Sequence, residues 1–137
     1  MGKIEVNRPD VVAEVETAFK NYERALTENI VEDLTTMFWD SPLTLRYGAA
    51  EMLYGAKAIH DFRAARPSGP RPRDLIRFVI TTYGDSVATA NAEYRVANDR
   101  RLGRQSQTWI KFDDGWRIVA AHVSFMDGSE DNRDQQR

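Results

Sequence analysis

Two polar side chains and a tryptophan near the end of the chain have the types and spacing to line a binding pocket. They lie in two β-rich runs joined by Asp114-Gly115, a pair typical of a tight hairpin turn because both positions tolerate positive φ. With Asp114 and Gly115 in the turn, strand alternation puts Gln107 opposite His122 and on the same face as Trp109. Pocket walls combine apolar surface with a few polar groups that orient a ligand. The hairpin therefore predicts one wall of a small-molecule pocket.

A phenol and a guanidinium earlier in the chain could add acid and anion-binding chemistry. Tyr22 lies in a stripe of apolar residues that recurs every three or four positions over residues 11–26, so its hydroxyl enters whatever this helix covers. Arg46 lies in a short alternating run, residues 43–47, on the face opposite the apolar residues of that run. The simpler interpretations are a core tyrosine that donates to a backbone carbonyl and a solvated or ion-paired surface arginine. The pattern alone leaves both alternatives open.

The elements that position these side chains follow from hydrophobic periodicity. Asn7, Pro9 and Asp10 indicate the start of a helix, with Asn7 as its side-chain cap. Helical spacing predicts helices over residues 10–26, 30–37 and 55–66. Alternation predicts strands over residues 43–47, 52–55, 75–83, 87–96, 102–112 and 116–125. Helices followed by a long antiparallel meander predict the α+β class, with the helices packed on one face of a curved, cone-shaped sheet.

The open mouth of such a cone is a natural place for a small molecule. In the strand at residues 87–96, Asn91 and Glu93 share the face opposite an alanine-rich face. His60 and Arg63 fall beside the apolar side of the third helix and are predicted to be surface residues. We expect the arginines of the proline-rich loop that follows this helix to be solvated as well.

Composition narrows the function classes. We expect one domain over residues 1–126 and a polar, disordered tail over residues 127–137. A net charge of −2 offers no electrostatic footprint for nucleic acid. The chain has no cysteine, which excludes disulfides, thiolate nucleophiles and zinc–sulfur sites. No apolar run approaches the roughly 20 residues that span a bilayer, so a cytoplasmic protein without membrane association is expected.

Metal and cofactor chemistry is not expected. The two histidines, His60 and His122, have no spaced carboxylate partner that would complete a three-ligand site. No glycine-rich phosphate cradle follows a strand, and no serine lies in a nucleophile elbow. The sequence favours a reaction without a cofactor.

Several motifs together resemble a known family. The order of the helices, Tyr54-Gly55-Ala56-Lys57-Ala58-Ile59 at a helix start, and the terminal Asp-Gly-Trp-Arg-Ile-Val-Ala-Ala-His-Val-Ser resemble the SnoaL-like branch of the nuclear-transport-factor superfamily, which has a cystatin-like α+β barrel. Residues 77–84 and the Gly-Arg-Gln-Ser-Gln-Thr-Trp run at 103–109 resemble the narrower AtzH-like group. The ending also resembles the association domain of calcium/calmodulin-dependent kinases, where the positions matching Asn91 and Gln107 are arginines that face a pocket.

The AtzH-like resemblance implies a decarboxylase in bacterial cyanuric acid breakdown. It would convert dicarboxyurea to allophanate and carbon dioxide, alongside amidase-signature enzymes. The positions equated with the catalytic pair are Tyr22, as proton donor, and Arg46, which would hold the distal carboxylate or neutralise charge at the urea oxygen as the bond breaks. Asn91, Gln107 and His122 would orient the amide edges of the substrate, although each could equally serve in hydrogen bonds within the sheet.

Two alternative functions remain open at this point. The chain could be a non-catalytic module that binds a small acid or assembles with an amidase. It could also be a SnoaL-like isomerase or hydrolase of the oxalurate pathway, a class that places an acidic base inside the cone, for which Glu93 is the candidate. A homodimer or higher homo-oligomer is expected, because the convex face of such sheets is commonly apolar and covered, with the alanine-rich face of residues 87–96 as a candidate.

Overall fold

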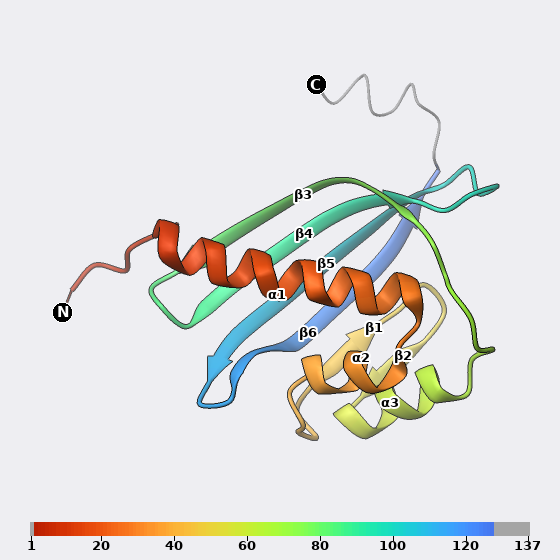
Figure 1. The fold of residues 1–137 in the computed structure, drawn as a ribbon, viewed down its shortest axis with the longest axis horizontal. Coiled ribbons are helices and arrows are strands. Elements are labelled where there is room, and N and C mark those ends of the chain that lie inside the picture. The colour runs from red at the N-terminus through yellow and green to blue at the C-terminus, as the bar shows by residue number, and fades with distance from the viewer. Residues whose placement is uncertain (1, 128–137) are drawn as a thin grey trace.

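A six-stranded sheet curves around one long helix in the computed structural model, which describes residues 2–127 (Figure 1). The helices are α1 (Pro9–Glu28), α2 (Val31–Met37) and α3 (Ala56–Ala64). The strands are β1 (Leu45–Tyr47), β2 (Met52–Tyr54), β3 (Asp74–Tyr83), β4 (Val87–Arg95), β5 (Leu102–Phe112) and β6 (Gly115–Met126). Their order in the sheet is β2-β1-β6-β5-β4-β3. The α+β prediction is confirmed, and the predicted tail beyond Asp127 lies outside the described residues.

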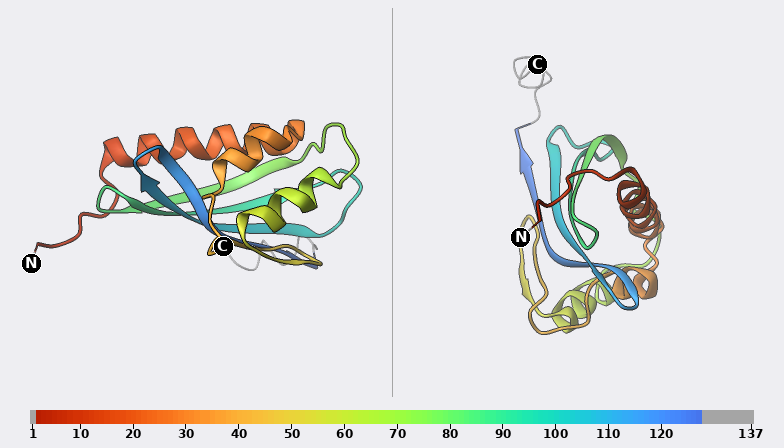
Figure 2. Two further views of the ribbon diagram at one scale, coloured as in Figure 1. Left: turned by 90° about the horizontal axis from the view of Figure 1, so that it is seen from below. Right: turned by 90° about the vertical axis from the view of Figure 1, so that its left-hand side faces the viewer.

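The sheet is antiparallel except for one pair of strands. β1 runs parallel to β6, with Leu45 beside Ala120, while every other neighbouring pair is antiparallel. The sheet bends so that its inner face wraps α1, and α2 and α3 close one end (Figure 2). This bend leaves room for a cavity beyond the last turns of α1.

The core lies between α1 and the inner face of β3, β4 and β5. The predicted stripe on α1 is confirmed, with its buried members at Val11, Val15, Phe19, Tyr22 and Ala25. These side chains share one hydrophobic cluster with Ala88, Ala90 and Ala92 of β4. The small alanine side chains let the helix approach the sheet closely. The alanine-rich face, a candidate dimer surface that the sequence could not distinguish from core, is therefore core.

The start of α1 differs from the prediction. Asn7 adopts a left-handed conformation (φ 59°) and provides no side-chain cap. Its backbone amide donates to the Thr82 carbonyl at 3.0 Å, and its Oδ1 accepts from the Thr82 amide at 2.9 Å. Asn7 therefore ties the chain before α1 to the end of β3. Pro9 still begins the helix, because its fixed φ suits the first helical position.

The β5–β6 hairpin has a different register from the predicted one. Its turn residues are Asp113 and Asp114, so Gly115 already pairs with Phe112. A bulge between Thr108 and Trp109 then changes the register of β5 against β6 by one residue. As a result, Gln107 lies opposite Ala121 and Ser106 lies opposite His122. Because neighbouring residues of a strand face opposite ways, Gln107 and His122 lie on different faces of the sheet.

Candidate functional site

A cavity of about 490 Å³ opens where α1 ends, between the sheet and the loop that connects α3 to β3. Its lining comes from α1, β1, that loop, β4, β5 and β6. The lining residues are Tyr22, Leu26, Arg46, Arg66, Pro70, Arg71, Pro72, Arg73, Tyr94, Val96, Ala97, Gln105, Val123 and Phe125. We call it the arginine cavity. The structure thus brings Tyr22 and Arg46, which are 24 residues apart in sequence, to the same hollow.

Tyr22 is held by a buried arginine. Its hydroxyl oxygen accepts a hydrogen bond of 2.8 Å from Nη2 of Arg63 on α3, and only 2% of Tyr22 and 3% of Arg63 is exposed. The rings of Phe38 and Trp109 meet the phenol ring edge to face, with centroids 6.0 and 6.4 Å away. These contacts on three sides fix the phenol.

Arg46 projects inward from β1 and keeps part of its guanidinium available. Its Nη1 pairs with Glu51 Oε1 at 2.9 Å, and the rest of the group lies at the cavity. Glu51 reaches Arg46 by folding over Gly48, where an added Cβ would collide with the Glu51 carboxylate. The apolar face of this segment turns outward instead, and Leu43 is 74% exposed. Arg46 is therefore a buried, partly paired arginine.

Arg73 forms the most rigid part of the wall. Its guanidinium donates to both oxygens of Glu23, at 2.8 and 2.6 Å, and to Gln105 Oε1 at 3.1 Å, and it lies 4.0 Å from the Tyr94 ring centroid. Burial alone would lower the pKa of Arg73, but the Glu23 carboxylate outweighs this and raises the pKa above its ordinary value. Tyr94 in turn lies flat against Gly103, where a Cβ would collide with its ring.

Positive charge around the arginine cavity exceeds negative charge. Within residues 2–127, no carboxylate forms an ion pair with Arg63, Arg66 or Arg71. Burial lowers the pKa of Arg66, and the nearby charges of Arg71 and Arg63 lower it further. The buried Nε atoms of Arg63 and Arg71 and the Nε2 of Gln105 have no hydrogen-bond partner in the part of the chain that the structure describes. A site with surplus donors and surplus positive charge suits an anion that brings several acceptor oxygens.

Comparison with known proteins assigns the family. The AtzH-like family model matches residues 4–129. The chain belongs to the AtzH-like family. No curated protein matches this AtzH-like chain.

Solved structures agree with the fold. A Pectobacterium atrosepticum protein of unknown function is 52% identical to the AtzH-like chain, with a TM-score of 0.86 over 88% of this chain and 94% of its own. A Burkholderia xenovorans protein described as having a cystatin-like fold is 47% identical, with a TM-score of 0.85 over 90% and 97%. A nuclear transport factor 2-like protein from Pseudomonas putida is 14% identical, with a TM-score of 0.74 over 85% and 87%, and it supports the fold alone.

The other predicted binding residues do not meet at the arginine cavity. Asn91 lies on the outer face of the sheet, where its Oδ1 accepts from Ser106 Oγ at 2.6 Å. His122 is exposed on the same face, edge to face with Tyr47 at 5.6 Å. Gln107 is buried on the inner face and accepts from Trp109 Nε1 at 3.0 Å. Gln105, two residues earlier on that face, lines the cavity instead.

Glu93 lies beside Asn91 on the outer face of β4, since its neighbours Ala92 and Tyr94 are the buried members of that strand. The oxalurate-pathway alternative needs an acidic base inside the cone, and Glu93 is not placed there. Glu23, a carboxylate beside the cavity, accepts two hydrogen bonds from Arg73.

Sequence reasoning missed the arginines that follow α2. Arg63 was predicted to be a surface residue and is buried, because it lies one helical turn after Ile59, whose side chain enters the core. The spacing of four residues between Ile59 and Arg63 was the sequence signal that could have indicated the burial of Arg63. The loop arginines were expected to be solvated, yet Arg71 and Arg73 turn inward to the cavity. His60, by contrast, has a side chain that is 45% exposed, as a surface residue should.

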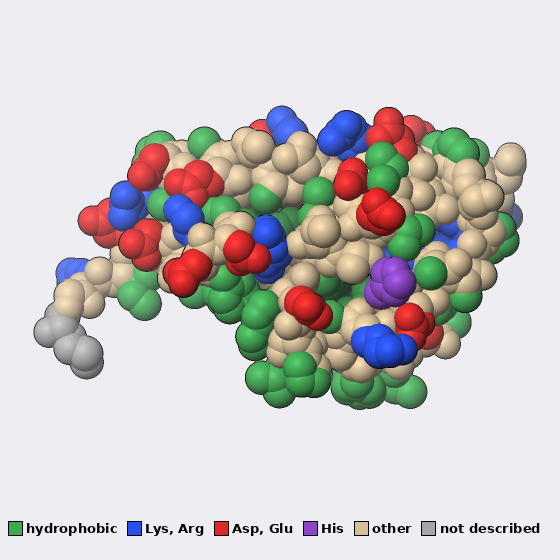
Figure 3. Space-filling view, turned by 60° about the horizontal axis from the view of Figure 1, so that its bottom comes forward, with side chains coloured by type: hydrophobic (Ala, Val, Ile, Leu, Met, Phe, Trp, Pro, Cys, Tyr) green, Lys and Arg blue, Asp and Glu red, His purple; other side chains and the backbone are tan. Residues whose placement is uncertain are grey.

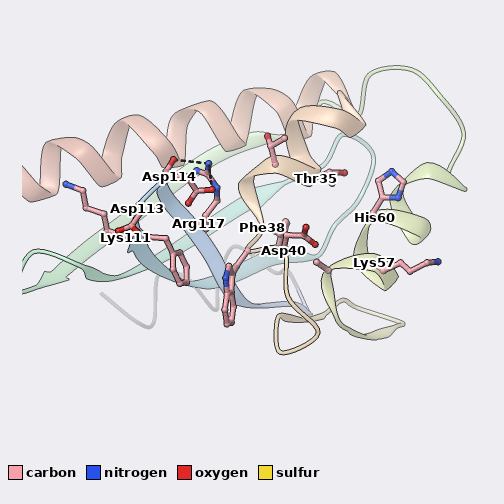
Figure 4. Close-up of a pocket in the computed structure, with 13 residues that line it drawn as sticks. Thr35, Phe38, Asp40, Lys57, His60, Lys111, Asp113, Asp114 and Arg117 are labelled. Carbon is pink, nitrogen blue, oxygen red and sulfur yellow. Dashed lines mark hydrogen bonds and ion pairs between the residues drawn. The ribbon is translucent and has the colours of Figure 1, made fainter.

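A second and larger hollow, of about 1020 Å³, lies between α2, α3 and the tip of the β5–β6 hairpin. We call it the hairpin groove. Its labelled residues come from both sides in Figure 4, with Lys57 and His60 on α3 and Lys111, Asp113, Asp114 and Arg117 on the hairpin.

The lysines and the arginine of the hairpin groove each form an ion pair with a nearby carboxylate. Arg117 bonds to Asp114, Lys111 bonds to Glu14, and Lys57 bonds to Asp61. Acidic and basic side chains are also interspersed over the face of the molecule that Figure 3 shows. Within residues 2–127, no group of three histidine or acidic side chains could hold a metal ion, and no helix is long and apolar enough to cross a membrane.

Proposed function

We propose that this AtzH-like protein is a cofactor-free decarboxylase of a small N-carboxylated urea, converting dicarboxyurea to allophanate and carbon dioxide in bacterial cyanuric acid breakdown. The single observation that supports this most is the meeting of Tyr22 and Arg46 in a cavity with surplus arginines. The proposed reaction class is the one that the resemblance to the AtzH-like family implies, and the family match over residues 4–129 supports it. The charge of the cavity fits a substrate with two carboxylates.

The arginines can hold both ends of such a substrate. Arg46 has N–H groups that Glu51 does not use, and a guanidinium can hold a carboxylate through two parallel hydrogen bonds. Arg66 and Arg71, on the loop side of the cavity, have no carboxylate partner among residues 2–127 and would take the second carboxylate. Apolar wall residues such as Val123 and Phe125 exclude water from the group that leaves.

The chemical step needs one proton. The bond between nitrogen and the departing carboxyl carbon breaks, carbon dioxide leaves, and the electron pair stays on nitrogen. Tyr22 donates its phenolic proton to that nitrogen, which yields neutral allophanate nitrogen and a phenolate that regains a proton from solvent. General acid assistance of this kind accelerates a reaction by roughly a hundredfold to ten-thousandfold.

The test is carbon dioxide release from freshly generated dicarboxyurea. We expect Tyr22→Phe to lower kcat by roughly a hundredfold or more, because it removes only the proton donor. Arg46→Ala should lower kcat/KM by about a hundredfold, because a buried contact to a charged group is worth roughly 2 to 5 kcal/mol. Lys57→Ala, in the hairpin groove, is the matched control and should retain wild-type activity. Wild-type rates in both cavity variants would reject the assigned pair.

The non-catalytic alternative uses the same cavity and predicts a different result. A binding module would hold a small dicarboxylate without releasing carbon dioxide. Calorimetric binding of malonate together with no turnover of dicarboxyurea would favour that alternative.

We further propose a homodimer that covers the outer face of the sheet. Large apolar side chains are exposed there and on the neighbouring β2, including Met52 at 72% and Tyr54 at 62%. Such surface is commonly covered by a partner. Light scattering should give twice the chain mass, and Met52→Glu should shift the protein toward the monomer. A monomeric wild type at high concentration would reject the dimer.

A further inference from the structure

Arg63 and Tyr22 are far apart in sequence, and their side chains form a hydrogen bond to each other. Neither side chain forms another hydrogen bond within residues 2–127. Arg63 Nη2 and Tyr22 Oη are 2.8 Å apart, and both residues are almost fully buried. The guanidinium carbon of Arg63 lies over the Phe38 ring, 5.7 Å from its centroid. Arg63 forms no ion pair with a carboxylate within residues 2–127, and its Nε has no partner.

Hydrogen-bond counting fixes where the phenolic proton points. A guanidinium carries only donors, so the Tyr22 oxygen must be the acceptor in this bond. The hydroxyl hydrogen of Tyr22 is therefore free for a different acceptor. No other hydrogen bond of Tyr22 exists among the described side chains, and the residue lines the arginine cavity. The proton is thus available to a molecule in the cavity.

Burial makes Arg63 sensitive to a nearby negative charge. Removing a cation from water without a counter-charge costs several kcal/mol. Burial lowers the pKa of Arg63, and the charge of nearby Arg46 acts in the same direction, while Tyr22 opposes them. When Tyr22 gives up its proton, the resulting phenolate supplies the missing counter-charge at hydrogen-bond distance. Proton donation by Tyr22 therefore gives the buried Arg63 cation a counter-charge, and it does not leave a buried phenolate without one.

We propose that Arg63 is the positioning residue of the reaction: it orients the Tyr22 hydroxyl toward the cavity and stabilises the phenolate left by proton transfer. This inference rests on the proposed decarboxylation. Arg63 does not line the cavity and acts only through Tyr22. Arg63 neither gains nor loses a proton in this step. The proton passes from the Tyr22 phenol to the substrate nitrogen, and solvent returns a proton to the phenolate.

Separate measurements of kcat and KM distinguish this positioning role from a role in substrate binding. Arg63→Met should lower kcat by at least tenfold and change KM little, because it alters the acid and leaves the carboxylate-holding arginines in place. Arg71→Ala should raise KM with a smaller effect on kcat. Arg63→Lys, which keeps a donor and a positive charge, should recover part of the lost kcat. Equal kcat in Arg63→Met and wild type would overturn the proposal, and so would a methionine variant as active as the lysine variant.

Folding and function are checked by separate measurements. Malonate binding by calorimetry should be similar in wild type and Arg63→Met, which shows that the cavity of the variant is intact. A variant that binds no malonate is replaced by Arg63→Gln, to which the same kcat criterion applies.

The contact itself has a readout that needs no activity. Slowly exchanging guanidinium protons of Arg63 should be visible by ¹⁵N NMR in the wild type and lost in Tyr22→Phe. If wild type released no carbon dioxide while this signal behaved as expected, the proposed function would fail and the Arg63–Tyr22 contact would stand. If the signal were absent from the wild type, the positioning role would fail regardless of activity.

Discussion

The arginine cavity and the hairpin groove are both polar hollows, yet they differ in how their charges are balanced. The groove is about twice as large, at about 1020 against 490 Å³, but its cations bond to carboxylates beside them. In the cavity, Glu23 and Glu51 pair with Arg73 and Arg46, and further arginines remain without a counter-charge. Arginines without a counter-charge, and not volume, distinguish the cavity as the hollow suited to an anionic ligand.

The largest stability effect is expected at the Glu23–Arg73 pair. Glu23→Gln keeps the shape but leaves the Arg73 guanidinium buried without its counter-charge, which should cost about 3 kcal/mol of the free energy of unfolding. Chemical denaturation measures the loss, and Asp114→Asn on the exposed Arg117 pair is the matched control, expected to change little. Added malonate should raise the Tm of Glu23→Gln more than that of the wild type. An equal loss of unfolding free energy in Glu23→Gln and Asp114→Asn would contradict the difference in charge pairing between the cavity and the groove.

The expected effect of arginine substitutions on malonate affinity also differs between the two hollows, and it is smaller than the stability effect at Glu23. Arg71→Ala removes an unpaired guanidinium from the cavity and should weaken malonate binding by about tenfold, or roughly 1.4 kcal/mol. Arg117→Ala removes a paired guanidinium from the groove and should leave binding unchanged. Calorimetry at constant ionic strength compares them, because salt screens such contacts. Weaker binding in Arg117→Ala alone would move the anion site to the groove.

The smallest effect is expected at Glu14, at the edge of the groove. Its hydrogen bond from Lys111, followed by that from Trp116, lowers the pKa of the Glu14 carboxyl below its ordinary value of 4.5. A lowered folded-state pKa stabilises the fold above the ordinary value, and this stabilisation is lost as pH falls through the folded-state value. Glu14→Gln should therefore be slightly less stable than wild type at neutral pH, with the difference shrinking below pH 4.5. A difference in Tm that stayed constant with pH would mean that the charge of Glu14 contributes nothing.

Most of the fold could be predicted from the sequence because each element has a clear periodicity. The α1 stripe and the strands agree with the structure to within a few residues. The hairpin register could not be predicted, because the bulge at Thr108 and Trp109 and the turn at Asp113 and Asp114 are alternatives that the same residues also permit. One residue of slip was enough to put His122 on the wrong face.

The candidate site was predictable only in part. Tyr22 and Arg46 came from a family resemblance, and the structure places both at one cavity. Arg71 could not be assigned from pattern, because a proline-rich loop is normally solvated. For Arg63 the spacing of four residues from Ile59 was the one available signal of burial, and it did not indicate a contact with Tyr22. The burial of both arginines depends on packing between segments distant in sequence, namely α3 and its following loop against α1.

The parallel pairing of β1 with β6 has a consequence for how the protein matures. The strand that carries Arg46 is hydrogen-bonded between a short hairpin partner, β2, and β6, which is the last strand within residues 2–127. A nascent chain that has not yet released β6 from the ribosome lacks the neighbour that fixes this arginine, however well its helices have formed. Competence to hold an anion therefore requires that β6 has been synthesised, and fragments truncated before β6 should be inert.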